Sequence, residues 1–258
     1  MIKDIFNGIQ AYFKVYTILN KLNLWGYFIV PVIISFILGV LILFTAYGLS
    51  DNIGNFIANI WGFSWGKETV TTISHFIGGL IVVALGIVIF KHTLMAIVSP
   101  FMSPISEKVE KHLLGSVYKQ SSGLKAQTSA LARGIRLNAR NLVVEILWII
   151  PLFIFSFIPL IGIIFVFLIF LVQAYYAGFG NMDYTLERYF PYKKSVAFVR
   201  NHRGIAIGNG IVFMLILLIP IVGILIVLPL SVVASTTTTL KALHPEKFNN
   251  NDKTLTKI

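Results

Sequence analysis

Apolar residues form four long stretches along the chain, separated by shorter polar segments. Residues 26–49 carry no charged side chain, and residues 69–98 are apolar up to Lys91 and His92. Each stretch exceeds the roughly 20 helical residues that cross the hydrocarbon core of a bilayer. We therefore predict two transmembrane helices, one over residues 26–49 and one over residues 69–98.

The two later apolar stretches, 142–180 and 205–240, are interrupted by the same Pro-x-x-Gly pattern. The interrupting residues are Pro159 with Gly162 and Pro220 with Gly223. Proline stops an incoming helix and fits the first turn of the next one, and glycine allows close approach. The arms before the prolines are 17 and 15 residues long, which is too short for a comfortable crossing at about 1.5 Å per residue. We predict two helical hairpins that enter the membrane partway, with full-length hairpins as the alternative.

Residues 1–24 and 101–140 show apolar side chains at helical spacing among polar ones. The first segment predicts an amphipathic helix that lies at the membrane interface. Its apolar positions are Ile2, Ile5, Ile9, Phe13 and Tyr16. In the second segment we expect a helix that Ser103 caps and Gly115 ends, followed by another amphipathic helix. Residues 244–258 are polar and predict a flexible tail.

Composition identifies the class of protein. Hydrophobic residues make up 57% of the chain and charged residues 12%, whereas a soluble domain carries about a quarter charged residues. Too few polar side chains remain to cover a surface that faces water. The prediction is an all-α integral membrane protein with a single membrane domain over residues 1–243. It combines two long transmembrane helices, two partly penetrating helical hairpins and cytoplasmic amphipathic helices.

The basic residues are distributed unequally about these predicted segments. Twenty of the 21 lysines and arginines fall on one side of the membrane, and only Lys67 falls on the other. Because lysine and arginine are enriched in cytoplasmic loops, we expect both termini in the cytoplasm. This topology accounts for the net charge of +11, so nucleic acid is not an expected partner.

No catalytic or metal-binding motif appears in the sequence. The five histidines show no pair at metal-ligand spacing, and we expect no enzyme activity, no metal and no cofactor. Lys91, His92 and Glu145 lie near the ends of apolar stretches, and we interpret them as side chains that extend toward the interface. Gln173, deep in a hairpin arm, either lines a polar path or bonds across helices.

Three arginines before the first hairpin share one helical face. Arg133, Arg136 and Arg140 are spaced three and four residues apart. One interpretation is a surface that attracts anions. The other is contact with lipid phosphates, which amphipathic helices commonly make.

Several motifs occur in an order that resembles a known family. They are "SPFMSPISEKVE", "IPLIG", "YYAGFGNMDYTLER", "VRNHRGIAIGNG" and "IPIVG". Together they resemble the CysZ-type sulfate permeases over roughly residues 5–242. The resemblance implies a multi-pass protein of the bacterial inner membrane, oligomeric assembly and sulfate uptake. Family members carry a Gly-Leu/Ile-Arg step for sulfate at the head of the first span, where this chain reads Asn23-Leu24-Trp25-Gly26. That site therefore does not carry over.

Two functions remain open from the sequence. The first is an inner-membrane anion permease or channel of the sulfate type, without an ATP motor. The residues expected along its path are Arg188, Arg200, Arg203, Asn181, Asp183 and Gln173. The second is a non-transporting scaffold or assembly protein that holds partners or shapes lipid. The expected partners are a small inorganic anion, the lipid bilayer and further copies of the chain, with other membrane proteins as an additional class.

Overall fold

The computed structural model describes residues 1–59, 72, 82, 85–118, 123–219 and 222–248. Throughout these residues the regular structure is helical, as the hydrophobic pattern predicts. The bounds are α1 Ile2–Gln10, η1 Ala11–Lys14, α2 Val15–Lys21, η2 Trp25–Phe28, α3 Ile29–Asn59, α5 Ser99–Leu114, α6 Leu124–Phe155, α7 Gly162–Tyr189, α8 Tyr192–Asn201, α9 Arg203–Leu217 and α10 Val222–Leu243. A further helix, described from Leu85 to Ile97, precedes α5.

Several described helices are long and apolar enough to cross a membrane. Four of them qualify singly: Trp25–Thr45, Leu124–Phe155, Gly162–Tyr189 and Leu225–Leu243. A fifth span arises if the Leu85–Ile97 helix and α5, which meet at a bend of 68°, count as one. The chain is thus an all-α, multi-pass membrane protein.

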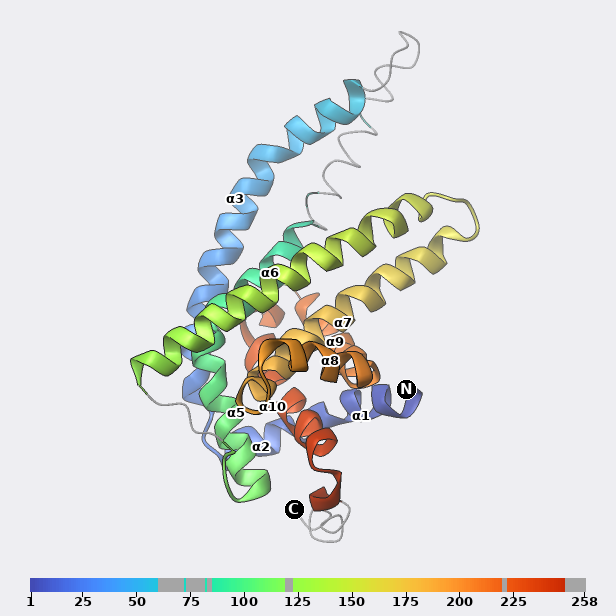
Figure 1. Ribbon diagram of the computed structural model, residues 1–258. Helices are drawn as coiled ribbons and strands as arrows, with labels where there is room; N and C mark the ends of the chain where they lie inside the picture. Colours follow the sequence, from blue (N-terminus) through green and yellow to red (C-terminus); the bar gives the residue numbers. More distant parts are fainter. Residues whose placement is uncertain (60–71, 73–81, 83–84, 119–122, 220–221, 249–258) are drawn as a thin grey trace.

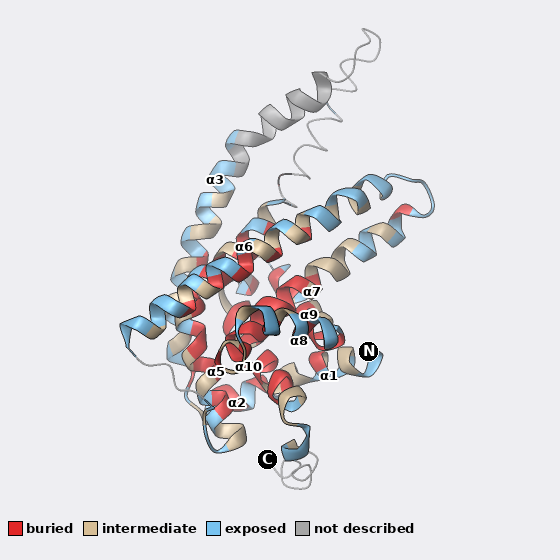
Figure 2. Ribbon diagram, in the orientation of Figure 1, coloured by how far each residue is buried: buried red, intermediate tan, exposed pale blue. Residues whose placement is uncertain are grey.

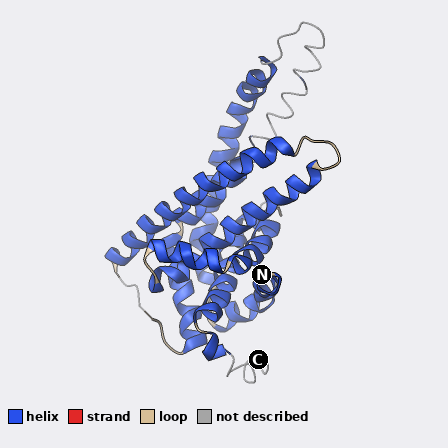
Figure 3. Ribbon diagram, turned by 45° about the vertical axis from the view of Figure 1, so that its right-hand side comes forward, coloured by secondary structure: helices blue, strands red, loops and turns tan. Residues whose placement is uncertain are grey.

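The described helices form a compact body from which α3 and the pair α6–α7 project (Figure 1). Helix α3 and the antiparallel pair α6–α7 extend upward in Figure 1, and the shorter helices gather below them. The turned view shows the same division (Figure 3). Buried residues concentrate in the body, whereas the projecting ends of α6 and α7 are largely exposed (Figure 2). Such exposed apolar ends suit contact with lipid.

The first long apolar stretch extends further than the sequence indicated. The 3-10 helix η2 leads directly into α3, which continues to Asn59, past the predicted end at residue 49. The start of the segment predicted as an outer loop is therefore helical. Most of residues 69–84, the first half of the predicted second span, lie outside the described residues.

Helix α6 joins two segments that the sequence separated. It runs without a break from Leu124 to Phe155, so the second amphipathic stripe and the first hairpin arm are one helix. Pro159 lies between α6 and α7, in a turn where Leu160 has φ of 71°. A Cβ on Gly162 would lie 2.1 Å from the Ser156 carbonyl oxygen, so only glycine fits there. The depth to which this pair enters the membrane stays a prediction.

Helices α9 and α10 form a second antiparallel pair. Pro220 of the predicted turn lies outside the described residues. A Cβ on Gly223 would lie 1.8 Å from the Ile216 carbonyl oxygen, so the two helices approach closely just beside the turn.

Small residues also hold α7 against α9. A Cβ on Gly178 would lie 1.9 Å from the Ala206 carbonyl oxygen, and one on Gly210 would lie 1.6 Å from that of Ala174. Helix α1 crosses α9 in a similar way, because a Cβ on Gly8 would lie 2.9 Å from Gly208 Cα. Such close backbone contact is typical of helices packed within membranes. The N-terminal helix is therefore packed against α9 as well as amphipathic.

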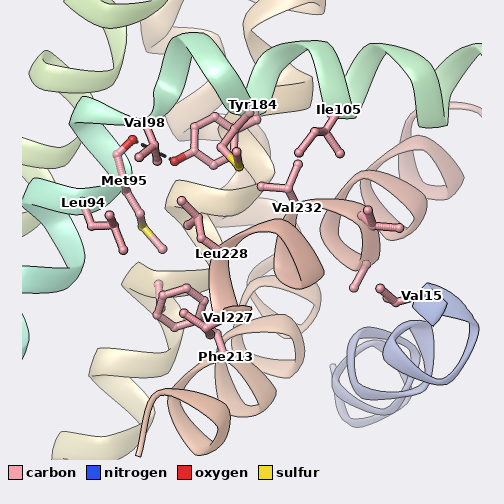
Figure 4. Packing of buried hydrophobic residues seen from close by; sticks show 14 of the residues in the cluster. Val15, Leu94, Met95, Val98, Ile105, Tyr184, Phe213, Val227, Leu228 and Val232 are labelled. Atoms are coloured by element: carbon pink, nitrogen blue, oxygen red, sulfur yellow. Dashed lines mark hydrogen bonds between the residues drawn. The ribbon is translucent and has the colours of Figure 1, made fainter. Parts of the chain in front are cut away.

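The main hydrophobic core lies where the N-terminal helices, the Leu85–Ile97 helix, α5, α7, α9 and α10 meet. Figure 4 shows Met95, Tyr184, Phe213 and Leu228 packed together in this core. The Tyr184 hydroxyl donates a hydrogen bond of 2.8 Å to the Met95 carbonyl oxygen. The core fixes the helices that carry the charged groups described next.

Candidate functional site

Charged side chains inside the body form three separate networks, each of which joins helices distant in the sequence. The first unites Arg188 of α7 with Glu110 of α5. Arg188 Nε and Nη2 lie 2.8 and 2.7 Å from Glu110 Oε2, and both side chains are at most 1% exposed. The Tyr189 hydroxyl donates to Glu110 Oε1 at 2.6 Å. Arg188 is thus buried and neutralised.

The second network unites Arg133 of α6 with Asp183 of α7. Arg133 Nε and Nη2 donate to the two carboxylate oxygens of Asp183 at 2.9 and 2.8 Å, a bidentate arrangement. The same guanidinium donates to the Phe190 carbonyl oxygen at 2.8 Å and to Ser195 Oγ at 2.7 Å. Arg133 therefore joins α6, the end of α7 and the start of α8.

The third network lies between the Leu85–Ile97 helix, α6 and α7. Lys91 Nζ lies 2.5 Å from Glu145 Oε1, and His92 Nε2 lies 2.8 Å from Glu145 Oε2. Lys91 also donates to the Gln173 carbonyl oxygen at 3.2 Å, and His92 Nδ1 lies 3.2 Å from Asn138 Oδ1. All three ionisable side chains are at most 2% exposed. The interpretation of Lys91, His92 and Glu145 as residues that extend to the interface is wrong, because the helices place them against one another.

Basic side chains also gather outside these networks. Arg140 of α6 lies over the Phe179 ring of α7, with 5.7 Å between the guanidinium carbon and the ring centre. Arg200 and Arg203 are exposed, and Arg203 Nε donates to the Arg200 carbonyl oxygen at 3.2 Å. We call Arg140, Arg200 and Arg203 the arginine cluster. These arginines belong to α6, the end of α8 and the start of α9, and both α6 and α9 pack against α7.

The sequence-predicted path residues are distributed over these features. Arg200 and Arg203 belong to the arginine cluster, whereas Arg188 and Asp183 are held in buried ion pairs. Asn181 is buried and its Nδ2 donates to the Ala177 carbonyl oxygen at 3.1 Å, with Oδ1 unpaired. Gln173 contributes its backbone carbonyl to Lys91. The structure therefore does not bring the six residues into one site.

The three arginines that share one face of α6, Arg133, Arg136 and Arg140, lie in three different environments. Arg133 pairs with Asp183 as described, Arg136 lies over the Tyr192 ring at 4.6 Å, and Arg140 lies over the Phe179 ring at 5.7 Å. Only Arg140 joins the arginine cluster, so the row is not one uniform surface.

The N-terminal segment supplies a buried tyrosine to the body. The Tyr12 hydroxyl lies 2.9 Å from the Asn209 carbonyl oxygen and 2.8 Å from Ser231 Oγ. Burial raises the pKa of Tyr12 above its usual range. The hydroxyl therefore stays protonated and links η1 to α9 and α10.

Within the described residues, no group of three or more histidine and acidic side chains forms a metal-ion site. The position of the absent family arginine is occupied by apolar side chains. Leu24 is fully buried, and Trp25 donates from Nε1 to Asn20 Oδ1 at 2.7 Å. The arginines of the described structure are therefore those of the buried networks, those of the arginine cluster and Arg136, which lies over the Tyr192 ring.

Sequence reasoning missed the partners of the charged residues. Glu110 lies 78 residues from Arg188, and Arg133 lies 50 residues from Asp183. One signal was present: Lys91 and Glu145 lie near the ends of apolar stretches and carry opposite charges, and such residues in a membrane usually pair with one another.

Comparison with known families places these features in context. Residues 11–227 match the family described as sulfate transporter CysZ/Etoposide-induced protein 2.4, which covers most of the chain. No curated protein matched the chain in a sequence comparison. Because this match covers most of a chain that contains several membrane-spanning helices, the chain belongs to the sulfate transporter CysZ/Etoposide-induced protein 2.4 family.

Proposed function

We propose that this protein is a permease or channel for an inorganic oxyanion of the sulfate type, and that it works as a transporter without ATP hydrolysis and not as an enzyme. Membership of a sulfate transporter family supports an anion substrate. The observation that carries the proposal is the arginine cluster. Its three arginines belong to α6, α8 and α9, and both α6 and α9 pack against α7, a helix long enough to span the membrane.

Arginine suits this substrate. Its planar guanidinium donates two parallel hydrogen bonds to a tetrahedral oxyanion, and it keeps its charge at any physiological pH. In the described structure no carboxylate forms an ion pair with Arg200 or Arg203, unlike Arg133 and Arg188. The cluster thus keeps positive charge for an incoming anion.

The wider setting follows from the same charge distribution. The lysine and arginine bias favours both termini in the cytoplasm, and the family resemblance implies the bacterial inner membrane. The cluster then forms the cytoplasmic mouth of the path. Because the family resemblance implies oligomeric assembly, we also propose that the protein forms a homo-oligomer.

The test compares two double variants that remove equal charge. In R200Q/R203Q both exposed arginines of the cluster become neutral, and in K193Q/K194Q two exposed lysines of α8 become neutral. We expect the arginine variant to reduce initial sulfate uptake into proteoliposomes by roughly tenfold or more, the effect of losing charge-assisted hydrogen bonds. The lysine variant should transport normally. Equal uptake by both variants and the wild type would refute the role of the cluster.

One observation favours a non-transporting scaffold instead. The family's arginine at the head of the first span is absent, and Leu24 and Trp25 occupy that place. If folded, inserted protein gave no more uptake than empty vesicles while a membrane partner co-purified stably, the scaffold would replace the permease.

A further inference from the structure

The hydrogen bonds of the network formed by Lys91, His92 and Glu145 show which atoms of His92 and Glu145 share a hydrogen. Asn138 Nδ2 donates to the Gly134 carbonyl oxygen at 3.0 Å, which fixes the amide so that Oδ1 faces His92 Nδ1. An amide oxygen only accepts, so His92 Nδ1 carries a hydrogen. The contact of 2.8 Å between His92 Nε2 and Glu145 Oε2 then needs a second hydrogen. That hydrogen is either on the imidazole or on the carboxyl group.

Both placements give the same total charge. An imidazolium with a carboxylate sums to zero, and so does a neutral imidazole with a carboxylic acid. With Lys91 in its ammonium form, the three groups together carry +1. A buried charge is costly unless an opposite charge balances it. Within the described structure no second carboxylate forms an ion pair with Lys91 or His92.

A further donor lies on the same face of α6. Asn138, Asn141 and Glu145 are spaced three and four residues apart, so they share one helical stripe. Asn141 is fully buried, and its Nδ2 has no hydrogen-bond partner. Its Oδ1 accepts from Arg140 at 2.9 Å, which directs the amide nitrogen away from that arginine. This unpaired buried N–H lies one helical turn from Glu145 on α6 and is free to donate to an anionic ligand.

The network is also connected to the arginine cluster. Arg140 belongs to the cluster, and its hydrogen-bond partner Asn141 belongs to the stripe that holds Glu145. The two positively charged places are therefore neighbours along α6.

We propose that Lys91, His92 and Asn141 form a buried oxyanion-binding site, and that the Glu145 carboxylate occupies it in the present structure. The two carboxylate oxygens, held by Lys91 and His92, stand where two oxygens of a sulfate-type anion bind. Glu145 is an internal competitor that must leave for the anion to enter. This inference deepens the proposed function and rests on it for the identity of the ligand.

The direct test is equilibrium binding of radiolabelled sulfate to the purified full-length protein in detergent. In E145Q the competing charge is absent while Lys91 and His92 remain. Because a site occupied by a competitor shows an apparent affinity reduced by the fraction that is free, we expect E145Q to bind sulfate about tenfold more tightly, or better, than the wild type. Added sulfate should also raise the thermal midpoint of E145Q more than that of the wild type.

The double variant K91M/E145Q separates a ligand site from a structural ion pair. It removes both charges, and neutral replacement of a buried pair is usually tolerated by the fold. The proposal expects this variant to fold and to lose the tight binding of E145Q. A purely structural pair would leave binding in both variants equal to that of the wild type, which would overturn the proposal. If E145Q alone failed to fold, sulfate binding by K91M/E145Q would be compared with that of the wild type. Loss of binding in the double variant would support the site, and unchanged binding would overturn it.

Transport measured on the same proteins keeps this inference distinct from the proposed function. Sulfate uptake by the wild type with unchanged binding in E145Q would overturn the buried site and leave the permease intact. Tight sulfate binding by E145Q, lost in K91M/E145Q, without uptake by any variant would support the site and contradict the permease.

Discussion

Replacement of Arg188 by methionine removes the cation from one end of a fully buried ion pair. Glu110 then remains at 0% exposure without a cationic partner, with the Tyr189 hydroxyl at 2.6 Å and the Tyr118 backbone N–H at 2.8 Å as its remaining donors. Loss of one partner of such a pair costs about 3–5 kcal/mol. Because two donors stay in place, we expect a cost near the lower end, about 3 kcal/mol.

The assay is thermal unfolding of the purified protein in detergent. A chain of this size shifts its midpoint by roughly 2–4 °C per kcal/mol, so R188M should unfold about 6–12 °C below the wild type. The matched control is E110M/R188M, in which no charge is left unpaired and most of the loss should be recovered. The reasoning fails if R188M keeps the wild-type midpoint. It also fails if R188M loses sulfate uptake at full stability, because Arg188 would then contact the anion, as the sequence suggested.

Three further changes test the packing and the other buried contacts in the same unfolding assay. Arg133→Lys loses the bidentate fork to Asp183 and should destabilise by about 1–2 kcal/mol, and an unchanged midpoint would contradict that geometry. Gly210→Ala adds a Cβ that would lie 1.6 Å from the Ala174 carbonyl oxygen, so α7 and α9 must separate by about 1.8 Å, and the free energy of unfolding should fall by about 3 kcal/mol. Gly39→Ala is the control, because Gly39 has open space around it and the substitution should not destabilise the protein. Equal midpoints for the two variants would refute the close crossing of α7 and α9. Tyr12→Phe loses the hydroxyl contacts to α9 and α10 and should cost about 1–2 kcal/mol, so a gain in stability would exclude them.

Features that depend on local patterns were predictable from the sequence. The length of the apolar stretches indicates a helical membrane protein, because the bilayer sets how many apolar residues a span needs. Gly115 ends α5 in the left-handed conformation with φ of 76°, as its place after the helical pattern indicates. These features arise within a few residues of sequence.

Features that depend on contacts between helices were not predictable in the same way. Ser103 was expected to cap a helix, but α5 begins at Ser99, and the Ser103 hydroxyl instead donates to the Glu187 carboxylate 84 residues away. The charge of Arg188 suggested an anion contact, and nothing near it in the sequence indicates that Glu110 neutralises it. The partners of Lys91 and Glu145 likewise appear only when α6 packs beside the Leu85–Ile97 helix.

The central claim, transport of a sulfate-type anion, is tested most directly by uptake of radiolabelled sulfate into proteoliposomes of the purified wild-type protein, with empty vesicles as the control. The account predicts saturable uptake without added ATP that excess unlabelled sulfate blocks. Uptake equal to that of empty vesicles, from protein shown to be folded and inserted, would contradict it.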